Sequence, residues 1–422
     1  MLFGYTDVSA DPSGLHPDDP DLKSYEGLAP GFAEMLRLRL DTPGAWVGYL
    51  KAKGYELPDN YWDLYKPPLD QQTATEEDPL GSPIRSPALY AAEHSDTAFL
   101  TDRTLEELSG RESDAWFSLV TYIRPHPPLV APSPYNTVYA PETLPEPMHG
   151  LPLAELRQSH PFFNAYFSEP SNFGLYMGFD GELDRISARH IQEMRAVYLG
   201  LALEVDHHIG RLLDYLRNSG QYDDTLIVVT ADHGEMLGDQ HQWGKVCPFD
   251  AALKIPLIIR DPRQPDSFGQ TVSAFTESVD IAPTLAEWSG AEPYSGYDGR
   301  SLLSLLGGAT PADWRQQVFA EAELGDLSKP TQFQKATRLS AERANFALLQ
   351  DSHFKYVHFN GELDPLLYDL QSDPNEFYNI ASDDKSMHTL SRMASRMLDH
   401  RMTYGERAMS RLKITPEGLF VS

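Results

Sequence analysis

Apolar residues between Leu183 and Leu216 recur at three- and four-residue spacing, as they do along one face of an amphipathic helix. Gly220 follows at the point where such a helix would stop, because glycine readily adopts the left-handed conformation that ends helices. The spacing predicts a helix over 183–216 with one face packed on a sheet. The residues that define this face are Ile191, Met194, Val197, Tyr198, Leu201, Val205, Ile209, Leu212 and Leu216.

Three apolar runs predict strands. The run from Leu226 to Thr230 shows no polar alternation, which favours a strand buried on both faces. "LKIPLIIRDP" at 253–262 repeats this pattern, and "AWFSLVTYI" at 115–123 ends abruptly in the proline-rich "RPHPPLVAPSPYN". Helices that alternate with buried strands are typical of an α/β fold, so we expect a parallel or mostly parallel sheet.

The pattern changes after about residue 335. "NFALLQDSHFKYVHFN" alternates, a turn is expected at Gly361, and "LLYDLQSDPNEFYNIA" continues before a helical stretch from about Asp384 to Arg411. This order predicts a small antiparallel sheet followed by a terminal helix.

The chain is therefore expected to contain two domains, an α/β core over residues 1–335 and a smaller C-terminal domain over residues 336–422. Residues 7–30 and 57–90 are rich in Pro, Asp, Ser and Gly and have no sustained period, so we predict long surface loops there.

Composition narrows the choice of partners. The 422 residues include 34 basic and 62 acidic side chains, a formal net charge of −28, which opposes nucleic acid or an anionic membrane as a partner. An anionic ligand would need a local positive site. The single cysteine, Cys247, excludes an internal disulfide and favours the cytoplasm. No basic leader and no run near 18 apolar residues is present, so we predict neither export nor membrane insertion.

The stretch "TLIVVTADHGEMLGDQHQWGK" at 225–245 carries the clearest chemistry. Asp232 and His233 leave the predicted strand at its carboxyl end, where α/β sheets bind ligands, and Gly234 would let the backbone turn closely. A carboxylate and an imidazole could ligate one divalent cation, although two ligands do not complete a site. The alternative is that Asp232 caps a turn and His233 is a core histidine. The polar residues that follow favour a site, and they are Glu235, Asp239, His241 and Lys245.

The same stretch resembles the sulfatases of the alkaline phosphatase superfamily, in particular the branch that includes phosphonate monoester hydrolases. "IPLIIRDP", "ESVDIAPTLAEWSG", "YDGRSLLSLL" and "LLYDLQSDPNEFYNIA" also match and follow in family order, over most of residues 115–382. The resemblance implies an alkaline-phosphatase-like, mostly parallel sheet flanked by helices, with a smaller C-terminal α+β subdomain. It also implies a metal-dependent hydrolase of sulfate esters or of phosphonate or phosphate esters, hence a small anionic ester as substrate.

The resemblance also assigns roles to residues. Asp232 and His233 match the family's metal-binding pair, and Lys245 matches the lysine that contacts the sulfate or phosphonate group. His126, in "RPHPP", matches the histidine that faces the leaving-group oxygen. The alternatives are a solvated surface lysine and a turn histidine between prolines.

The resemblance also concerns three residues that could contact the substrate. Tyr5 and Thr6, in "FGYTD", resemble a family segment that lines the substrate pocket. His241 could also contact substrate, although hydrogen bonding within its loop would explain it equally well. The resemblance also implies a divalent cation as cofactor. We expect Mn²⁺ or Ca²⁺, with Mg²⁺ or Zn²⁺ as the alternatives. Homo-oligomers are common among the relatives, so we include one among the expectations.

The sequence departs from the family in one respect. The acidic pair that completes the metal site and the C-x-P-x-R motif that supplies a formylglycine nucleophile do not appear, and Cys247 lies in "CPFDA" instead. We interpret this as an N-terminally incomplete sulfatase core whose activity as an isolated chain is in doubt. The alternatives are a non-catalytic binding or assembly protein, or a variant with another nucleophile such as Thr6.

Overall fold

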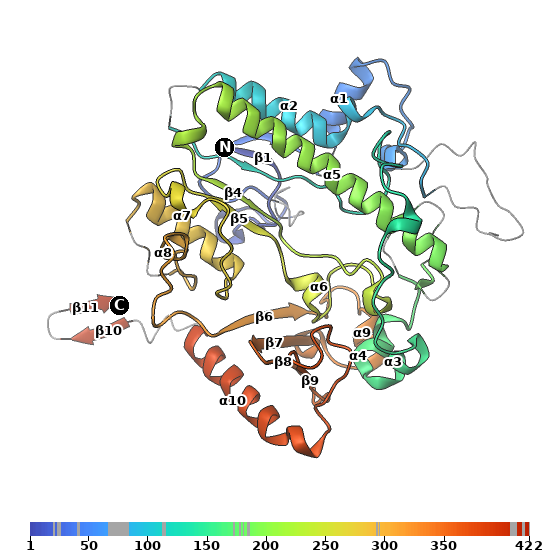
Figure 1. Ribbon diagram of the computed structural model, residues 1–422, viewed down its shortest axis with the longest axis vertical. Helices are drawn as coiled ribbons and strands as arrows, with labels where there is room; N and C mark the ends of the chain where they lie inside the picture. The colour runs from blue at the N-terminus through green and yellow to red at the C-terminus, as the bar shows by residue number, and fades with distance from the viewer. Residues whose placement is uncertain are drawn as a thin grey trace, which may run out of the picture. The chain divides into compact units, whose positions relative to one another are not determined.

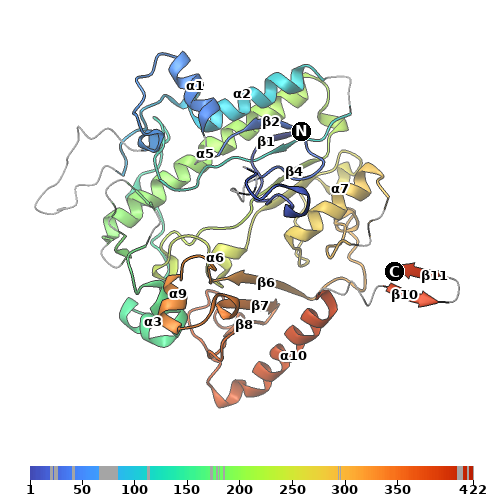
Figure 2. The same cartoon turned by 180° about the vertical axis from the view of Figure 1, so that it is seen from behind.

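The chain divides into two compact units, whose elements are labelled in Figures 1 and 2. Unit 1 comprises Met1–Glu146 and Pro170–Asp224, and unit 2 comprises Pro147–Glu169 and Thr225–Ser422. The computed structural model describes residues 1–19, 22, 27–39, 43–65, 84–111, 115–171, 174–176, 179, 181–183, 186–292, 294, 296–405, 412–415 and 418–421. The domain boundary expected at residue 335 stays a prediction.

A three-stranded parallel sheet lies in unit 1. Its order is β2-β1-β3, formed by β2 (Glu34–Arg37), β1 (Leu2–Gly4) and β3 (Leu119–Val120). The strand expected over 115–123 is therefore reduced to two residues. Its partner β1 is short, and only Leu2 and Phe3 pair with it. Beyond this pairing, the Thr121 N–H still donates to the Phe3 carbonyl at 2.9 Å.

The described residues of unit 1 form three α-helices, which are α1 (Gly44–Ala52), α2 (Asp96–Ser109) and α5 (Ala188–Asn218). The long helix predicted over 183–216 is confirmed as α5, and it packs along α2 (Figure 1). It starts at 188 because Ser187 caps it, accepting a hydrogen bond from the His190 N–H at 3.1 Å. Gly220 follows its end with a φ of 77°.

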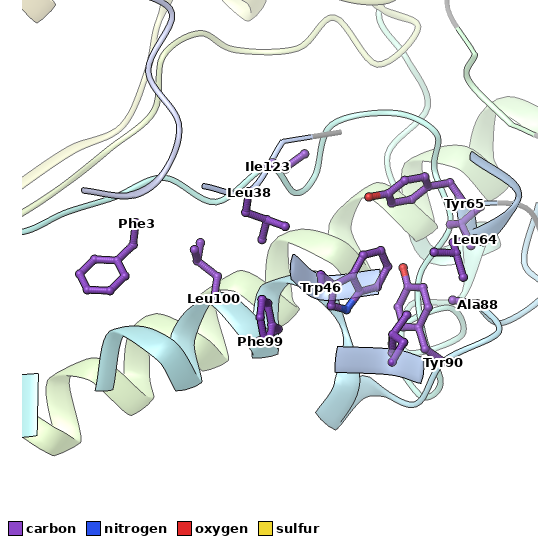
Figure 3. Packing of buried hydrophobic residues seen from close by; sticks show 12 residues of the cluster. Phe3, Leu38, Trp46, Leu64, Tyr65, Ala88, Tyr90, Phe99, Leu100 and Ile123 are labelled. Atoms are coloured by element: carbon purple, nitrogen blue, oxygen red, sulfur yellow. The ribbon is translucent and has the colours of Figure 1, made fainter. Parts of the chain in front are cut away.

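Aromatic and aliphatic side chains from the strands, helices and loops of unit 1 form its core (Figure 3). Trp46 is fully buried, and its ring meets that of Tyr90 edge to face at 5.0 Å. The residues of this core are Phe3, Leu38, Trp46, Leu50, Leu64, Tyr65, Ala88, Tyr90, Phe99, Leu100, Ile123 and Val130.

A two-stranded antiparallel sheet in unit 2 pairs β4 (Ile227–Thr230) with β5 (Leu257–Arg260). The prediction of a strand buried on both faces is wrong, because the first three residues of β4 are half-buried and Thr230 is exposed. The parallel arrangement expected for these strands is also wrong. A parallel crossover usually needs a helix that runs back along the sheet, whereas the connecting helix α6 (Asp250–Leu253) has only four residues.

A four-stranded antiparallel sheet confirms the C-terminal prediction. Its strands are β6 (Gln317–Glu323), β7 (Asn345–Asp351), β8 (Phe354–Phe359) and β9 (Leu366–Asp369), in that order. The terminal helix α10 (Met387–Tyr404) packs its buried Met393 and Met397 against this sheet. It ends before the expected Arg411, and residues 406–411 lie outside the described residues.

The remaining helices of unit 2 are short. Helix α4 (Pro161–Tyr166) packs on α9 (Gln332–Thr337). Its Phe162 contacts Phe333 of α9, and also Phe346 of β7 and Phe359 of β8. The other short helices are α3 (Leu153–Ser159), α7 (Ile281–Ser289) and α8 (Leu303–Leu306). After α10, the strands β10 (Leu412–Thr415) and β11 (Gly418–Val421) pair as an antiparallel hairpin.

The loops predicted over 7–30 and 57–90 are described only in part. The described parts of the loops predicted over 7–30 and 57–90 contain 3₁₀ turns, while residues 20–21, 23–26 and 66–83 lie outside the description. Within the described residues, no helix combines the length and apolar character that crossing a bilayer requires.

Candidate functional site

The loop that follows β4 brings three of the predicted site residues together. The Lys245 ammonium donates to His233 Nε2 at 2.6 Å, and Asp232 Oδ2 lies 3.2 Å from the same nitrogen. The His233 Nδ1–H donates to the Gly234 carbonyl at 2.7 Å, which leaves Nε2 as the acceptor of the neutral ring. All three side chains reach the surface, so a carboxylate, an imidazole and an ammonium face one accessible point.

Glu235 explains why residues twelve positions apart meet. Its Oε1 accepts from the Gly244 N–H at 2.5 Å and from the Leu237 N–H at 3.3 Å. The Met236 N–H donates to the Gly244 carbonyl at 3.1 Å, which closes the same loop. Burial raises the pKa of Glu235, and these backbone hydrogen bonds oppose that shift. The sequence showed Glu235 only as one polar residue of the loop.

Gly234 permits the close approach that the sequence suggested. Its N–H donates to the Ala252 carbonyl at 2.7 Å, and a Cβ at this position would lie 2.1 Å from the Ala251 carbonyl oxygen. The loop therefore leaves β4 in direct contact with the backbone of α6.

We expect Gly234→Ala to lower the free energy of unfolding by about 1–3 kcal/mol, because the methyl group meets backbone rather than a movable side chain. Thermal unfolding followed by circular dichroism measures the change. Gly210→Ala is the matched control, since its Cβ would meet nothing within 4 Å on α5 and alanine favours a helix. A Gly234→Ala protein as stable as this control would contradict the interpretation.

His241 has partners outside the group formed by Asp232, His233 and Lys245. Its ring stacks on that of His149 at 3.8 Å, and its Nε2–H donates to the Leu151 carbonyl at 3.0 Å. Burial is the main cause that lowers the pKa of His241. These contacts favour the structural alternative, and a role for His241 in substrate binding stays a prediction.

The other three predicted residues lie in unit 1. His126 is exposed, and its Nδ1–H donates to the Pro127 carbonyl at 2.5 Å. Tyr5 packs partly against the core of unit 1, and its N–H donates to Thr121 Oγ1 at 2.7 Å. The Thr6 hydroxyl donates to the Gly27 carbonyl at 2.8 Å. Both therefore follow β1 as expected, and their roles in a substrate pocket stay predictions.

A buried ion pair beneath His126 was not recognised in the sequence. The Arg124 and Asp96 side chains are almost inaccessible, and Arg124 Nε donates to Asp96 Oδ2 at 3.2 Å. Arg124 Nη1 also donates to the Pro128 carbonyl at 3.0 Å and to the His126 carbonyl at 3.4 Å. The guanidinium therefore fixes the backbone on both sides of Pro127, including that of His126.

Asp232 and His233 supply donor types that suit a divalent cation. Two donors are fewer than the four or more that such ions usually require. Among the described residues, no group of three or more His, Cys, Asp or Glu side chains could hold a metal. The described residues thus form no complete metal site, and a role for Asp232 and His233 as metal ligands stays a prediction.

Cys247 is buried two residues after Lys245. It is 2% exposed, and burial raises the pKa of its thiol to about 12. A thiol in this state is a poor nucleophile near neutral pH, because the thiolate is the reactive form.

Comparisons with known proteins identify relatives of the chain. The model described as "Sulfatase" matches residues 47–291, and "N-sulphoglucosamine sulphohydrolase, C-terminal" matches residues 238–403. The multifunctional alkaline phosphatase superfamily protein PehA of Trinickia caryophylli is 35% identical over 419 residues, which are 99% of this chain and 79% of that protein. The choline-sulfatase of Rhizobium meliloti is 27% identical over 297 residues, 68% of this chain and 51% of that protein.

Solved structures give the same picture. The phosphonate monoester hydrolase SpPMH from Silicibacter pomeroyi superposes with a TM-score of 0.92 at 43% identity, covering 100% of this chain and 81% of that chain. The phosphonate monoester hydrolase of Agrobacterium radiobacter gives 0.91 at 32% identity with the same coverage.

Proposed function

Because the chain belongs to the sulfatase family of the alkaline phosphatase superfamily, we propose that its loop of Asp232, His233 and Lys245 binds the charged end of a sulfate, phosphonate or phosphate ester. One observation carries this proposal. The Lys245 ammonium and the Asp232 carboxylate lie 2.6 and 3.2 Å from His233 Nε2, at the surface of a protein that is acidic as a whole.

Each side chain has a distinct part in the proposed site. Lys245 provides a positive charge for an oxygen of the anion, which the net charge of −28 would otherwise repel. Asp232 and His233 would hold a divalent cation, Mn²⁺ or Ca²⁺ in our proposal, with His233 Nε2 binding the cation in place of its hydrogen bond from Lys245. The cation would neutralise further charge on the ester. The comparisons support a hydrolase, since the relatives named above include phosphonate monoester hydrolases and a sulfatase.

His126 is proposed to donate a proton to the leaving-group oxygen. Its Nδ1–H is engaged with the Pro127 carbonyl. Donation must therefore come from Nε2, which carries a proton only in the imidazolium form.

A second candidate function is binding without turnover. The only cysteine of the 422 residues is the buried Cys247, and "CPFDA" does not fit the C-x-P-x-R sequence that supplies the family's nucleophile. A chain that binds an oxyanion without a nucleophile would act as a binding or assembly protein. We also propose a cytoplasmic protein with no affinity for nucleic acid, supported by the single thiol and the acidic composition. That it forms a homo-oligomer is a proposal from the family resemblance.

Calorimetric titration with phenylphosphonate and with sulfate, in the presence of Mn²⁺ or Ca²⁺, tests the proposed function on the full chain. We expect Lys245→Met to weaken phenylphosphonate binding about tenfold or more, because a hydrogen bond to a charged group contributes about 1.5–3 kcal/mol. Lys335→Met is the matched control, since its ammonium pairs with Glu169 on the surface at 2.7 Å.

Hydrolysis of an aryl sulfate and of a phosphonate monoester separates the two candidates. Turnover that depends on Lys245 and His126 supports the hydrolase. Binding that depends on Lys245 without turnover supports the second candidate. A folded chain that binds neither anion, with or without cation, would contradict both.

A further inference from the structure

One lysine of the C-terminal sheet is completely buried. Lys355 lies on β8, paired in register with Gln350 of β7 and Tyr368 of β9, and its side chain is 0% exposed. Its ammonium donates to Asp250 Oδ1 at 2.5 Å and to the Pro248 carbonyl at 3.1 Å, and it pairs with the Glu376 carboxylate. Three acceptors thus match the three N–H groups of an ammonium.

These acceptors connect the sheet to the loop that carries Lys245. Pro248 and Asp250 follow Lys245 by three and five residues, and the Cys247 N–H donates to the Lys245 carbonyl at 2.9 Å. Glu376 reinforces the connection, because its Oε2 accepts from the Asp250 N–H at 2.9 Å. The ammonium of Lys355 therefore fixes the backbone directly after Lys245.

A second contact fixes the loop on the other side of Lys245. Gln240 is buried, and its Nε2 donates to the carbonyls of Asn375 and Glu376 at 3.3 and 3.2 Å. Glu376 thus bonds both ends of the segment 240–250. A buried ammonium loses its hydration, and this cost is offset only if each of its N–H groups has an acceptor. Loss of any of these contacts would therefore destabilise the arrangement.

We propose that Lys355 is a positioning residue for the oxyanion-binding loop. It acts through Pro248, Asp250 and Glu376 to hold Lys245 where its ammonium meets His233. The proposal rests on the proposed function of Lys245, and it adds a dependence of that site on the C-terminal sheet. The competing explanation is that Lys355 serves only the stability of the sheet.

The double variant Lys355→Met/Glu376→Gln tests the proposal. A single Lys355→Met change would leave the Glu376 carboxylate buried without its counter-charge, which destabilises proteins and would obscure the result. The double variant removes both charges and keeps an acceptor for the Asp250 N–H. Lys335→Met/Glu169→Gln is the matched control, because it makes the same two changes in the surface pair of unit 2.

Two measurements are made on the full chain: phenylphosphonate affinity by calorimetry, and hydrogen exchange of peptides across unit 2 by mass spectrometry. We expect about tenfold weaker binding and faster exchange confined to residues 236–249 in the Lys355 variant. The control should retain wild-type affinity and exchange. Unchanged affinity and unchanged exchange at 236–249 would overturn the proposal.

Two further outcomes distinguish the positioning role from sheet stability and from failure of the proposed function. If exchange rises equally over β6 to β9, Lys355 serves the stability of the sheet and the positioning role is refuted. If the wild-type chain binds no phenylphosphonate, the proposed function fails by itself. Hydrogen exchange then tests Lys355 alone, with a rise confined to 236–249 supporting the positioning role and no change refuting it.

Discussion

Arg124→Met should lower the free energy of unfolding by about 3–5 kcal/mol, the loss that follows when a buried ion pair keeps only one partner. The Asp96 side chain is 3% exposed, and Arg124 Nε is the cation that faces it at 3.2 Å. The guanidinium also lies 4.9 Å from the centre of the Tyr65 ring and bonds the Tyr90 hydroxyl at 3.3 Å. Methionine can fill much of this space, but it cannot balance the charge.

Urea and thermal unfolding of the variants, followed by circular dichroism, measure this loss. Arg103→Met is the control, because its pair with Glu106 is exposed and such pairs contribute about 0–1 kcal/mol. Arg124→Met/Asp96→Asn should recover much of the stability, since neither member of the pair is then charged. A single Arg124→Met variant that unfolds at the wild-type urea midpoint would refute the role of the pair.

Glu204→Gln should stabilise the protein at pH 8 by about 3 kcal/mol and change little near pH 4. Glu204 is fully buried on α5, and burial is the main cause that raises its pKa to about 7. A folded-state pKa above the unfolded value means that protonation favours folding. The stabilising contribution is complete below about pH 4.5 and is lost as the pH rises through 7.

The thermal midpoint measured between pH 4 and pH 8 tests this prediction. The wild-type midpoint should contain a fall over that range that the Glu204→Gln midpoint lacks, because glutamine stays neutral throughout. Asp206→Asn is the control from the exposed side of the same helix and should keep the wild-type profile. If the Glu204→Gln and wild-type curves stay parallel, Glu204 does not bind a proton on folding.

Local pattern predicted the helices better than the strands. The spacing over 183–216 identified α5 because an α-helix satisfies its own hydrogen bonds and its apolar face repeats within the segment. A strand depends on a partner elsewhere in the chain. The run at 115–123 therefore forms only β3, and the apolar run of β4 gave no sign that β5 would return antiparallel.

The site was predictable to the extent that it is contiguous. Asp232, His233 and Lys245 fall within one short stretch, and the structure brings them together. Lys355 and Glu376 were missed because alternation in "FKYVHF" cannot show that a lysine is buried against a loop more than a hundred residues earlier. Such contacts are fixed by tertiary structure, on which a periodic pattern carries no information.

The interleaved boundaries of the two units have a consequence for synthesis on the ribosome. Residues 147–169 emerge early, yet the His160 imidazole donates to the Asp364 carbonyl at 2.7 Å, and Phe162 packs on Phe346 and Phe359. At translation rates of about 5–20 residues per second, this apolar segment waits roughly ten seconds or more for its partners. Ribosome-bound chains halted near residue 300 should therefore bind a chaperone through this segment. Chains released at full length should no longer bind it.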